Sequence, residues 1–184
     1  MSTKTIITKK IPIPSGVKVE NNQGLLTFSS QSGTLKRRFL SPIINISINA
    51  DHILVTSKQK ASKNIKRIMN TIISHMKNMV LGVQTPYIYK LKIISGHFPM
   101  NVTLDKDTIR IKNFLGEKIA RKAKILQSVK AEIKGDEIIV TSIDKELAGQ
   151  TAGNIEMATR ITNKDRRIFS DGIYITQKAS KRIS

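Results

Sequence analysis

The residues best suited to chemistry in this sequence are lysines and arginines that lie in short segments of alternating polarity. The segment GTLKRRF, residues 33–39, is typical of a strand. Such a strand would present Lys36 and Arg38 on one face and Arg37 on the apolar face, where it must form a pair or reach past an edge. Exposed cations in these positions can bind phosphate oxygens. Alternatively, they serve only to protect an edge strand from pairing with another chain.

A second segment of this kind, IARKA, occupies residues 119–123. Arg121 lies between two apolar residues there, as Arg37 does, and Lys122 and Lys124 are expected to face outward. The pattern therefore offers the same phosphate-binding chemistry twice, and we include Arg121 among the candidate ligands of a polyanion.

The third basic region, TNKDRRIFSDGIYITQKASKRIS, covers residues 162–184. It predicts a turn at 170–172, where Gly172 would permit a close approach of RNA to the backbone, followed by a short strand at 173–175. Basic tails are often arms that become ordered on RNA, although a solvated terminus without a function has the same composition. The candidate RNA-binding cations here are Lys164, Arg166 and Arg167 before the turn, and Lys178, Lys181 and Arg182 after it.

Catalytic chemistry has little support in the sequence. The paired acids, Asp105 with Asp107 and Asp136 with Glu137, fall in predicted turns, where solvated carboxylates are common. The chain has no cysteine, its three histidines are far apart, and it contains no GxxxxGK[ST] phosphate loop. We therefore expect no enzyme activity, no metal, no cofactor and no small-molecule substrate.

The charge of the chain indicates a polyanionic partner. There are 32 lysines and arginines against 13 acids, a net charge of +19, and residues 1–85 contain only two of the acids. An anionic membrane is the alternative, but no segment reaches the roughly 18 apolar residues of a spanning helix. No apolar signal segment is evident at the start, so a cytoplasmic location is expected. Aromatic residues make up 4% and Trp is absent, which favours folded RNA over a free single strand.

The predicted elements that must position these cations occur twice, as an internal repeat. HILVTS at 52–57 returns as EIIVTS at 137–142, an offset of 85 residues. At an offset of 84, Arg37 matches Arg121 and Arg38 matches Lys122. Gly33 and Gly116 are predicted to open the corresponding strand in each copy. A diverged duplication explains such small differences in offset, because loops tolerate changes in length.

Each copy is predicted to contain several short strands followed by one helix. Turn residues at 21–24, 30–33 and 49–51 separate the strands of the first copy. Apolar residues at helical spacing then form one stripe: Ile65, Ile68, Met69, Ile72, Met76 and Met79. In the second copy a helix is expected up to Ala158, with Ser142 or Asp144 as its N-cap. The predicted fold is α+β, with two tandem similar domains at 1–84 and 85–162, each a small, mostly antiparallel sheet packed against one helix, and a basic extension at 163–184.

Five blocks of the chain, in order, resemble the large-subunit ribosomal protein family numbered six in bacteria and nine in eukaryotes. The blocks are GTLKRRF, SHMKNMVLGV (74–83), HFPMNV (97–102), IKNFLGEK (111–118) and NKDRRIFSDGIYI (163–175). The forms HFP, NFLGEK and NKD..R.F.DGIY are similar to the eukaryotic and archaeal members. The resemblance runs from the first strands to about residue 178.

The resemblance implies a role as a structural constituent of the large subunit of cytosolic ribosomes. It implies large-subunit rRNA as the ligand, near the sarcin–ricin loop and the base of the factor-binding stalk. Stalk-base proteins and other large-subunit proteins would be neighbours, and translation factors would dock nearby. The C-terminal domain and tail would supply the main contacts, which adds His97 and Phe98 to the candidates. A free RNA-binding chaperone outside the ribosome is the alternative that charge and duplication fit equally well.

Overall fold

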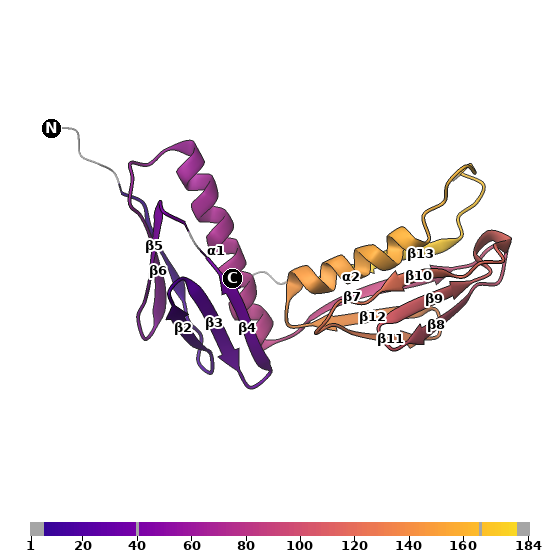
Figure 1. The fold of residues 1–184 in the computed structure, drawn as a ribbon, viewed down its shortest axis with the longest axis horizontal. Helices are drawn as coiled ribbons and strands as arrows, with labels where there is room; N and C mark the ends of the chain where they lie inside the picture. Colours follow the sequence, from indigo (N-terminus) through magenta and orange to yellow (C-terminus); the bar gives the residue numbers. More distant parts are fainter. Residues whose placement is uncertain (1–5, 40, 166, 180–184) are drawn as a thin grey trace. The chain divides into compact units, whose positions relative to one another are not determined.

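The computed structural model describes residues 6–39, 41–165 and 167–179. The chain divides into two compact units, Met1–Pro86 and Tyr87–Ser184. In the described residues, all strand pairs are antiparallel and each unit contains one α-helix (Figure 1). The predicted α+β class and the two tandem domains are therefore confirmed.

The first unit distributes its strands between two small sheets. One sheet has the order β1-β6-β5 and the other the order β2-β3-β4. Tight turns join neighbouring strands, and Gln23 and Gly24 between β2 and β3 both have positive φ, as a two-residue hairpin with the favoured twist requires. The elements are β1 (Thr8–Pro12), β2 (Lys18–Asn22), β3 (Leu25–Ser30), β4 (Gly33–Arg38), β5 (Ile44–Ile48), β6 (His52–Ser57) and α1 (Lys63–Gln84).

The second unit repeats this plan with one additional strand. Its sheets have the orders β11-β12-β7-β13 and β10-β9-β8. The additional strand, β13, lies in the segment expected to be a basic extension and pairs with β7, so 172–177 belongs to the sheet. The elements are β7 (Tyr87–Ile94), β8 (Asn101–Asp105), β9 (Thr108–Lys112), the 3₁₀ turn η1 (Phe114–Gly116), β10 (Arg121–Lys124), β11 (Lys130–Lys134), β12 (Glu137–Ser142), α2 (Lys145–Ala158) and β13 (Gly172–Gln177).

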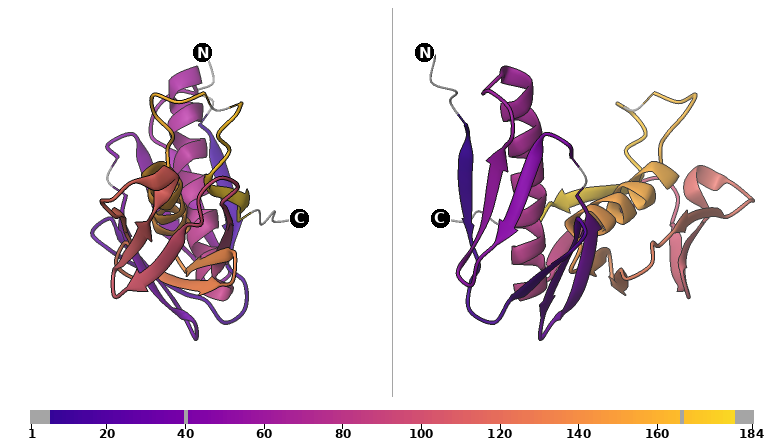
Figure 2. Two further views of the ribbon diagram at one scale, coloured as in Figure 1. Left: turned by 90° about the vertical axis from the view of Figure 1, so that its right-hand side faces the viewer. Right: turned by 60° about the vertical axis from the view of Figure 1, so that its left-hand side comes forward.

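In each unit the helix contacts strands of both sheets. Helix α1 contacts β3, β4 and β6, and α2 contacts β7, β10, β12 and β13 (Figures 1 and 2). The core of each unit lies between the helix and the sheets, because the alternating strands direct their apolar side chains to the helix side. The two cores contain, among others, Leu26, Phe28, Ile53, Met69 and Met76 in the first unit and Leu91, Ile109, Ile111, Ile138 and Ala152 in the second.

Helix α1 buries a slightly different stripe from the predicted one. Met69, Met76 and Met79 are buried as expected, but Ile68 is 38% exposed and Ile73 is buried in its place. Ile68 lies about 100° around the helix from Met69, at the border of the buried stripe, so its side chain keeps part of its contact with water. Ser62 caps the helix by accepting a hydrogen bond from the Ile65 N–H, and Pro86 follows its end.

Helix α2 has the predicted start. The Asp144 carboxylate accepts a hydrogen bond from the Glu146 N–H at 2.8 Å, and the Ser142 hydroxyl accepts one from the Asp144 N–H at 3.1 Å. Asp144 is therefore the N-cap, and Ser142 holds the capping residue in place.

The two units share the same plan of strands and helix, as the repeat predicted, but the strand register changes which cations are equivalent. Phe28 pairs with Leu35, whereas its counterpart Ile111 pairs with Arg121. The loop before β10 contains η1 and is longer than the turn before β4, so the offset at this strand is 86 rather than 84 residues. The equivalent cations are therefore Lys36 with Lys122, and Arg38 with Lys124. Gly116 lies in η1, not at the start of the strand.

Candidate nucleic-acid interface

Four exposed cations occupy equivalent positions on two edge strands. Lys36 and Arg38 lie on β4, at the edge of the sheet β2-β3-β4, and Lys122 and Lys124 lie on β10, at the edge of the sheet β10-β9-β8. In each pair, the side chains alternate with others that face the core, such as Ala123. We call these four residues the edge-strand bases.

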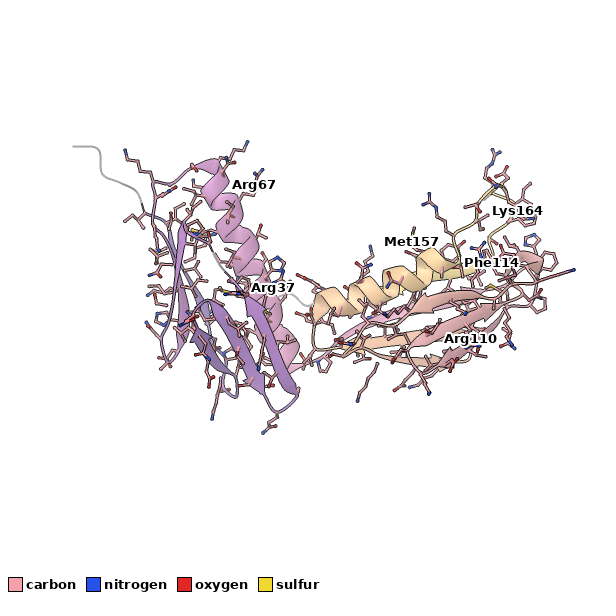
Figure 3. The ribbon with its side chains drawn as sticks, in the orientation of Figure 1. Arg37, Arg67, Arg110, Phe114, Met157 and Lys164 are labelled. Atoms are coloured by element: carbon pink, nitrogen blue, oxygen red, sulfur yellow. The ribbon has the colours of Figure 1, made fainter. Side chains whose placement is uncertain are left out.

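The outward face of the β8–β10 sheet carries further cations. Arg110 pairs across the sheet with Lys122, and Lys112 follows it on the same face of β9. Arg110, which Figure 3 labels, forms an ion pair with Asp105 at 2.7 Å, and both side chains are about half exposed. Asp105 therefore partly neutralises this face, and the face keeps a positive excess.

Arg121 is occupied within the protein. Its guanidinium donates to both carboxylate oxygens of Glu117, at 2.5 and 2.7 Å, and to the carbonyl oxygens of Ala158 and Arg160 at 3.0 Å each. It also stacks over the Phe114 ring, 4.3 Å from the centroid. The hydrogen bonds from Arg121 lower the pKa of Glu117 below its ordinary value. The candidate assignment of Arg121 to RNA is therefore replaced by a structural role at the end of α2.

The loop after β7 and the loop before β13 form a second cluster. His97 packs its ring against Phe169, with 5.0 Å between centroids, and the Lys164 ammonium lies 4.8 Å from the centre of the same ring. His97 and Phe98 are both 39% exposed. We call His97, Phe98, Lys164 and Phe169 the loop cluster. It offers aromatic surface next to a cation, which suits an unpaired base and its phosphate.

Asp171 holds the loop cluster in position, although the sequence pattern indicated only a turn at this residue. Its side chain is fully buried, and its oxygens accept hydrogen bonds from the N–H groups of Gly96, His97 and Phe98 at 2.7–3.3 Å. The imidazole Nδ1 of His97 lies 3.2 Å from the same carboxylate. Burial raises the pKa of Asp171, but these hydrogen bonds outweigh it and hold the pKa below the ordinary value. The sequence contained a signal for this role, because an acid among basic residues in a chain of charge +19 indicates a local structural contact.

Gly172 packs against an aromatic side chain of the protein itself. It is buried, its φ is +156°, and a Cβ at this position would lie 3.2 Å from the ring of Tyr174. Packing against the Tyr174 ring therefore accounts for a glycine at this position, and the predicted RNA contact of Gly172 stays a prediction.

The remaining predicted cations lie in different environments. Lys178 is exposed just after β13. Arg167 is 90% exposed and forms an ion pair with Asp165 at 2.8 Å, and its hydrogen bonds lower the pKa of Asp165. Arg166, Lys181 and Arg182 lie outside the described residues.

The paired acids lie at hairpin ends, as expected from the sequence. Asp105 ends β8 and Asp107 lies in the β8–β9 turn; Asp136 lies in the β11–β12 turn and Glu137 begins β12. In the described part of the chain, no group of three or more His, Cys, Asp or Glu residues is placed to hold a metal ion. None of the helices in the same part is long and apolar enough to cross a membrane.

Comparison with known proteins identifies the family. Residues 98–172 match the family model described as ribosomal protein L6. The large ribosomal subunit protein uL6 of Methanosarcina mazei is 43% identical, over 94% of this chain and 98% of the relative. The uL6 proteins of Methanococcus vannielii and Nanoarchaeum equitans are each 42% identical, over 98% and 97% of this chain and 99% and 96% of the relatives. The chain belongs to the ribosomal protein L6 family. The resemblance drawn from the sequence blocks is thus confirmed.

The part that matches the L6 family model contains most of the second unit's candidate surface. It begins at Phe98, spans β8 to α2, and ends at Gly172. Phe98 and Lys164 of the loop cluster, the edge-strand bases Lys122 and Lys124, and Asp171 all fall within it. The first unit, with Lys36 and Arg38, lies outside the matched region but inside the alignments with the archaeal L6 proteins, which cover nearly the whole chain.

Proposed function

We propose that this L6-family protein is a structural constituent of the large ribosomal subunit that binds folded rRNA and supports translation without catalysis. Membership of a family whose curated relatives are named large ribosomal subunit proteins carries this proposal. The net charge of +19 supports it, because a surface with this excess of cations attracts a polyanion.

The contacts would be made by two groups of side chains. The edge-strand bases supply phosphate contacts, which position the protein but read no sequence. The loop cluster, with His97 and Phe98 half exposed and Lys164 beside them, supplies a surface on which an unpaired base can stack. Lys178 and the basic residues outside the described part add to the same electrostatic attraction.

The finer location follows from the family resemblance. We propose a position near the sarcin–ricin loop and the base of the factor-binding stalk, in cytosolic ribosomes, with stalk-base proteins as neighbours and translation factors docking close by. Chemical crosslinking of protein to rRNA in purified large subunits, followed by sequencing of the crosslinked RNA, tests this position. Sedimentation of the protein mainly outside the large-subunit peak would instead favour a free chaperone.

A salt titration with matched variants tests the role of the edge-strand bases. The RNA is in vitro transcribed large-subunit rRNA of Methanosarcina mazei, and affinity is measured by filter binding between about 50 and 200 mM salt. We expect Lys122→Gln with Lys124→Gln to reduce the log–log salt slope by about 1.4–1.8, at roughly 0.7–0.9 per phosphate contact.

The control removes the same charge from another edge strand of the same unit. Lys130 and Lys134 are exposed on β11, at the edge of the other sheet, and Lys134 pairs with Glu132 at 3.3 Å. Lys130→Gln with Lys134→Gln is expected to leave the slope nearly unchanged. Equal effects of the two double variants would show that the β10 lysines only protect a strand edge and raise the net charge.

A further inference from the structure

One polar face of α1 in the first unit is a basic groove that the proposed contacts do not use. The groove, with a volume of about 590 Å³, is lined by one helical stripe that includes Lys63, Lys66, Arg67, Asn70, Ser74 and Asn78. At 1.5 Å per residue, the stripe from Lys63 to Asn78 is about 22 Å long. We call it the α1 groove.

Only cations and neutral polar groups line the α1 groove. Helix α1 contains no Asp or Glu, and residues 1–85 contain only Glu20 and Asp51. No ion pair between described side chains involves Lys63, Lys66 or Arg67. Figure 3 shows Arg67 near the N-terminal end of the helix. Lys9 on β1 donates to the Asn70 side chain at 2.8 Å, which brings a further cation to the side of the groove.

The position of these cations on the helix is unfavourable for the isolated protein. Lys63, Lys66 and Arg67 lie in the first turns of α1, where the helix dipole places positive charge and where acids are normally preferred. Three cations therefore repel one another and the helix end. A bound anion would remove this repulsion, so the arrangement points to an anionic ligand.

The form of the groove selects among anionic ligands. A membrane surface would need an exposed apolar face, but the apolar face of α1 is buried under the strands, with Met69, Met76 and Val83 inaccessible. An acidic protein would normally be held by a buried aromatic or apolar anchor. Among the large apolar side chains of α1, Ile68 is exposed at 38%, and it is not one of the residues that line the groove.

We propose that the α1 groove is a further RNA-binding surface, which holds the phosphate backbone of a folded RNA. This inference rests on the proposed function, and it adds a face of helix α1 to the edge-strand bases of the first unit. Lys63, Lys66 and Arg67 would pair with successive phosphates, and Arg67 is suited to bidentate contact. The Asn70 and Ser74 side chains would bond phosphate oxygens and 2′-hydroxyls farther along the helix.

The test removes two charges from the groove in the full chain. Lys66→Gln with Arg67→Gln removes two phosphate contacts, so we expect the log–log salt slope for the Methanosarcina mazei rRNA transcript to fall by about 1.4–1.8. At 0.1 M salt this corresponds to a loss of about 25- to 60-fold in affinity. The exchange Lys66→Arg with Arg67→Lys keeps both charges and should stay within about threefold of the unchanged protein. An unchanged slope in the glutamine variant would overturn the proposal.

Two further measurements keep the inference separate from the proposed function. The double variant of Lys122 and Lys124 serves as the second arm: if it weakens binding and the α1 variant does not, only the α1 groove is rejected. If the unchanged protein itself does not bind the rRNA transcript, the RNA-binding function is rejected. A photo-crosslinking residue at Ser74, in otherwise unchanged protein within assembled large subunits, reports the occupant directly. A crosslink to rRNA supports the proposal, and a crosslink to an acidic protein or none at all contradicts it.

Discussion

Asp171 is the residue whose removal should most change the second unit. Its buried carboxylate accepts hydrogen bonds from three consecutive backbone N–H groups, those of Gly96, His97 and Phe98. A hydrogen bond to a charged acceptor contributes about 1.5–3 kcal/mol, and a buried donor left without an acceptor costs about 1–3 kcal/mol. In the Asp171→Ala variant all three N–H groups lose this acceptor.

The expected loss of unfolding free energy is smaller than the sum of three bonds. His97 and Phe98 are 39% exposed, so water can reach part of the loop once the carboxylate is gone. We therefore expect Asp171→Ala to destabilise the second unit by about 3–4 kcal/mol, of the order seen when a buried charged network is broken.

Urea unfolding followed by circular dichroism measures this change, and hydrogen exchange of the 96–98 amides localises it. Asp165→Ala is the matched control, because the partly exposed Asp165 carboxylate of the adjacent loop bonds, among the described residues, the exposed Arg167 through its guanidinium and its backbone N–H. We expect the control to leave the unfolding midpoint unchanged. A shift of less than about 1 kcal/mol for Asp171→Ala, with 96–98 amides still protected, would refute the view that this carboxylate organises the loop cluster.

Three further predictions concern acid stability, Arg121 and the helix core. The pKa of Asp171 in the folded protein is below its ordinary value. Its contribution to stability is therefore complete above the unfolded pKa of about 3.9 and is lost as the pH falls through the lower folded pKa. In acid titrations, the difference in unfolding free energy between the unchanged protein and Asp171→Ala should shrink below about pH 4. Arg121→Lys keeps the charge but cannot make all the hydrogen bonds to Glu117, Ala158 and Arg160. Thermal or urea unfolding should therefore show a loss of about 1–2 kcal/mol in unfolding free energy, while rRNA affinity stays within about twofold. Met69→Ala should lower the unfolding free energy by about 2–5 kcal/mol in urea unfolding, because Met69 is inaccessible. The neighbouring Ile68→Ala should lower it by less than about 1 kcal/mol. Equal losses would mean that the helix is rotated from its described orientation.

The surface cations show which features the sequence pattern predicts and which it does not. The alternation in GTLKRRF predicted which side chains of β4 face outward, and Lys36 and Arg38 are exposed as expected. The alignment of Arg37 with Arg121 was wrong, because the letters of two diverged copies can be matched in more than one way. Only the hydrogen-bonded register shows that Lys122 and Lys124 are the counterparts of Lys36 and Arg38.

The repeated strands, the helix stripes, the turns and the excess of positive charge were determined by the sequence alone, because each depends on residues a few positions apart or on a simple sum. The division of each unit into two sheets, the engagement of Arg121 by the carbonyls of Ala158 and Arg160, and the burial of Asp171 under residues 96–98 were decided only by the tertiary structure. These contacts join residues 37 to 75 positions apart. Local periodicity states which face a side chain occupies, but the partner across the fold depends on how strands and helix pack together.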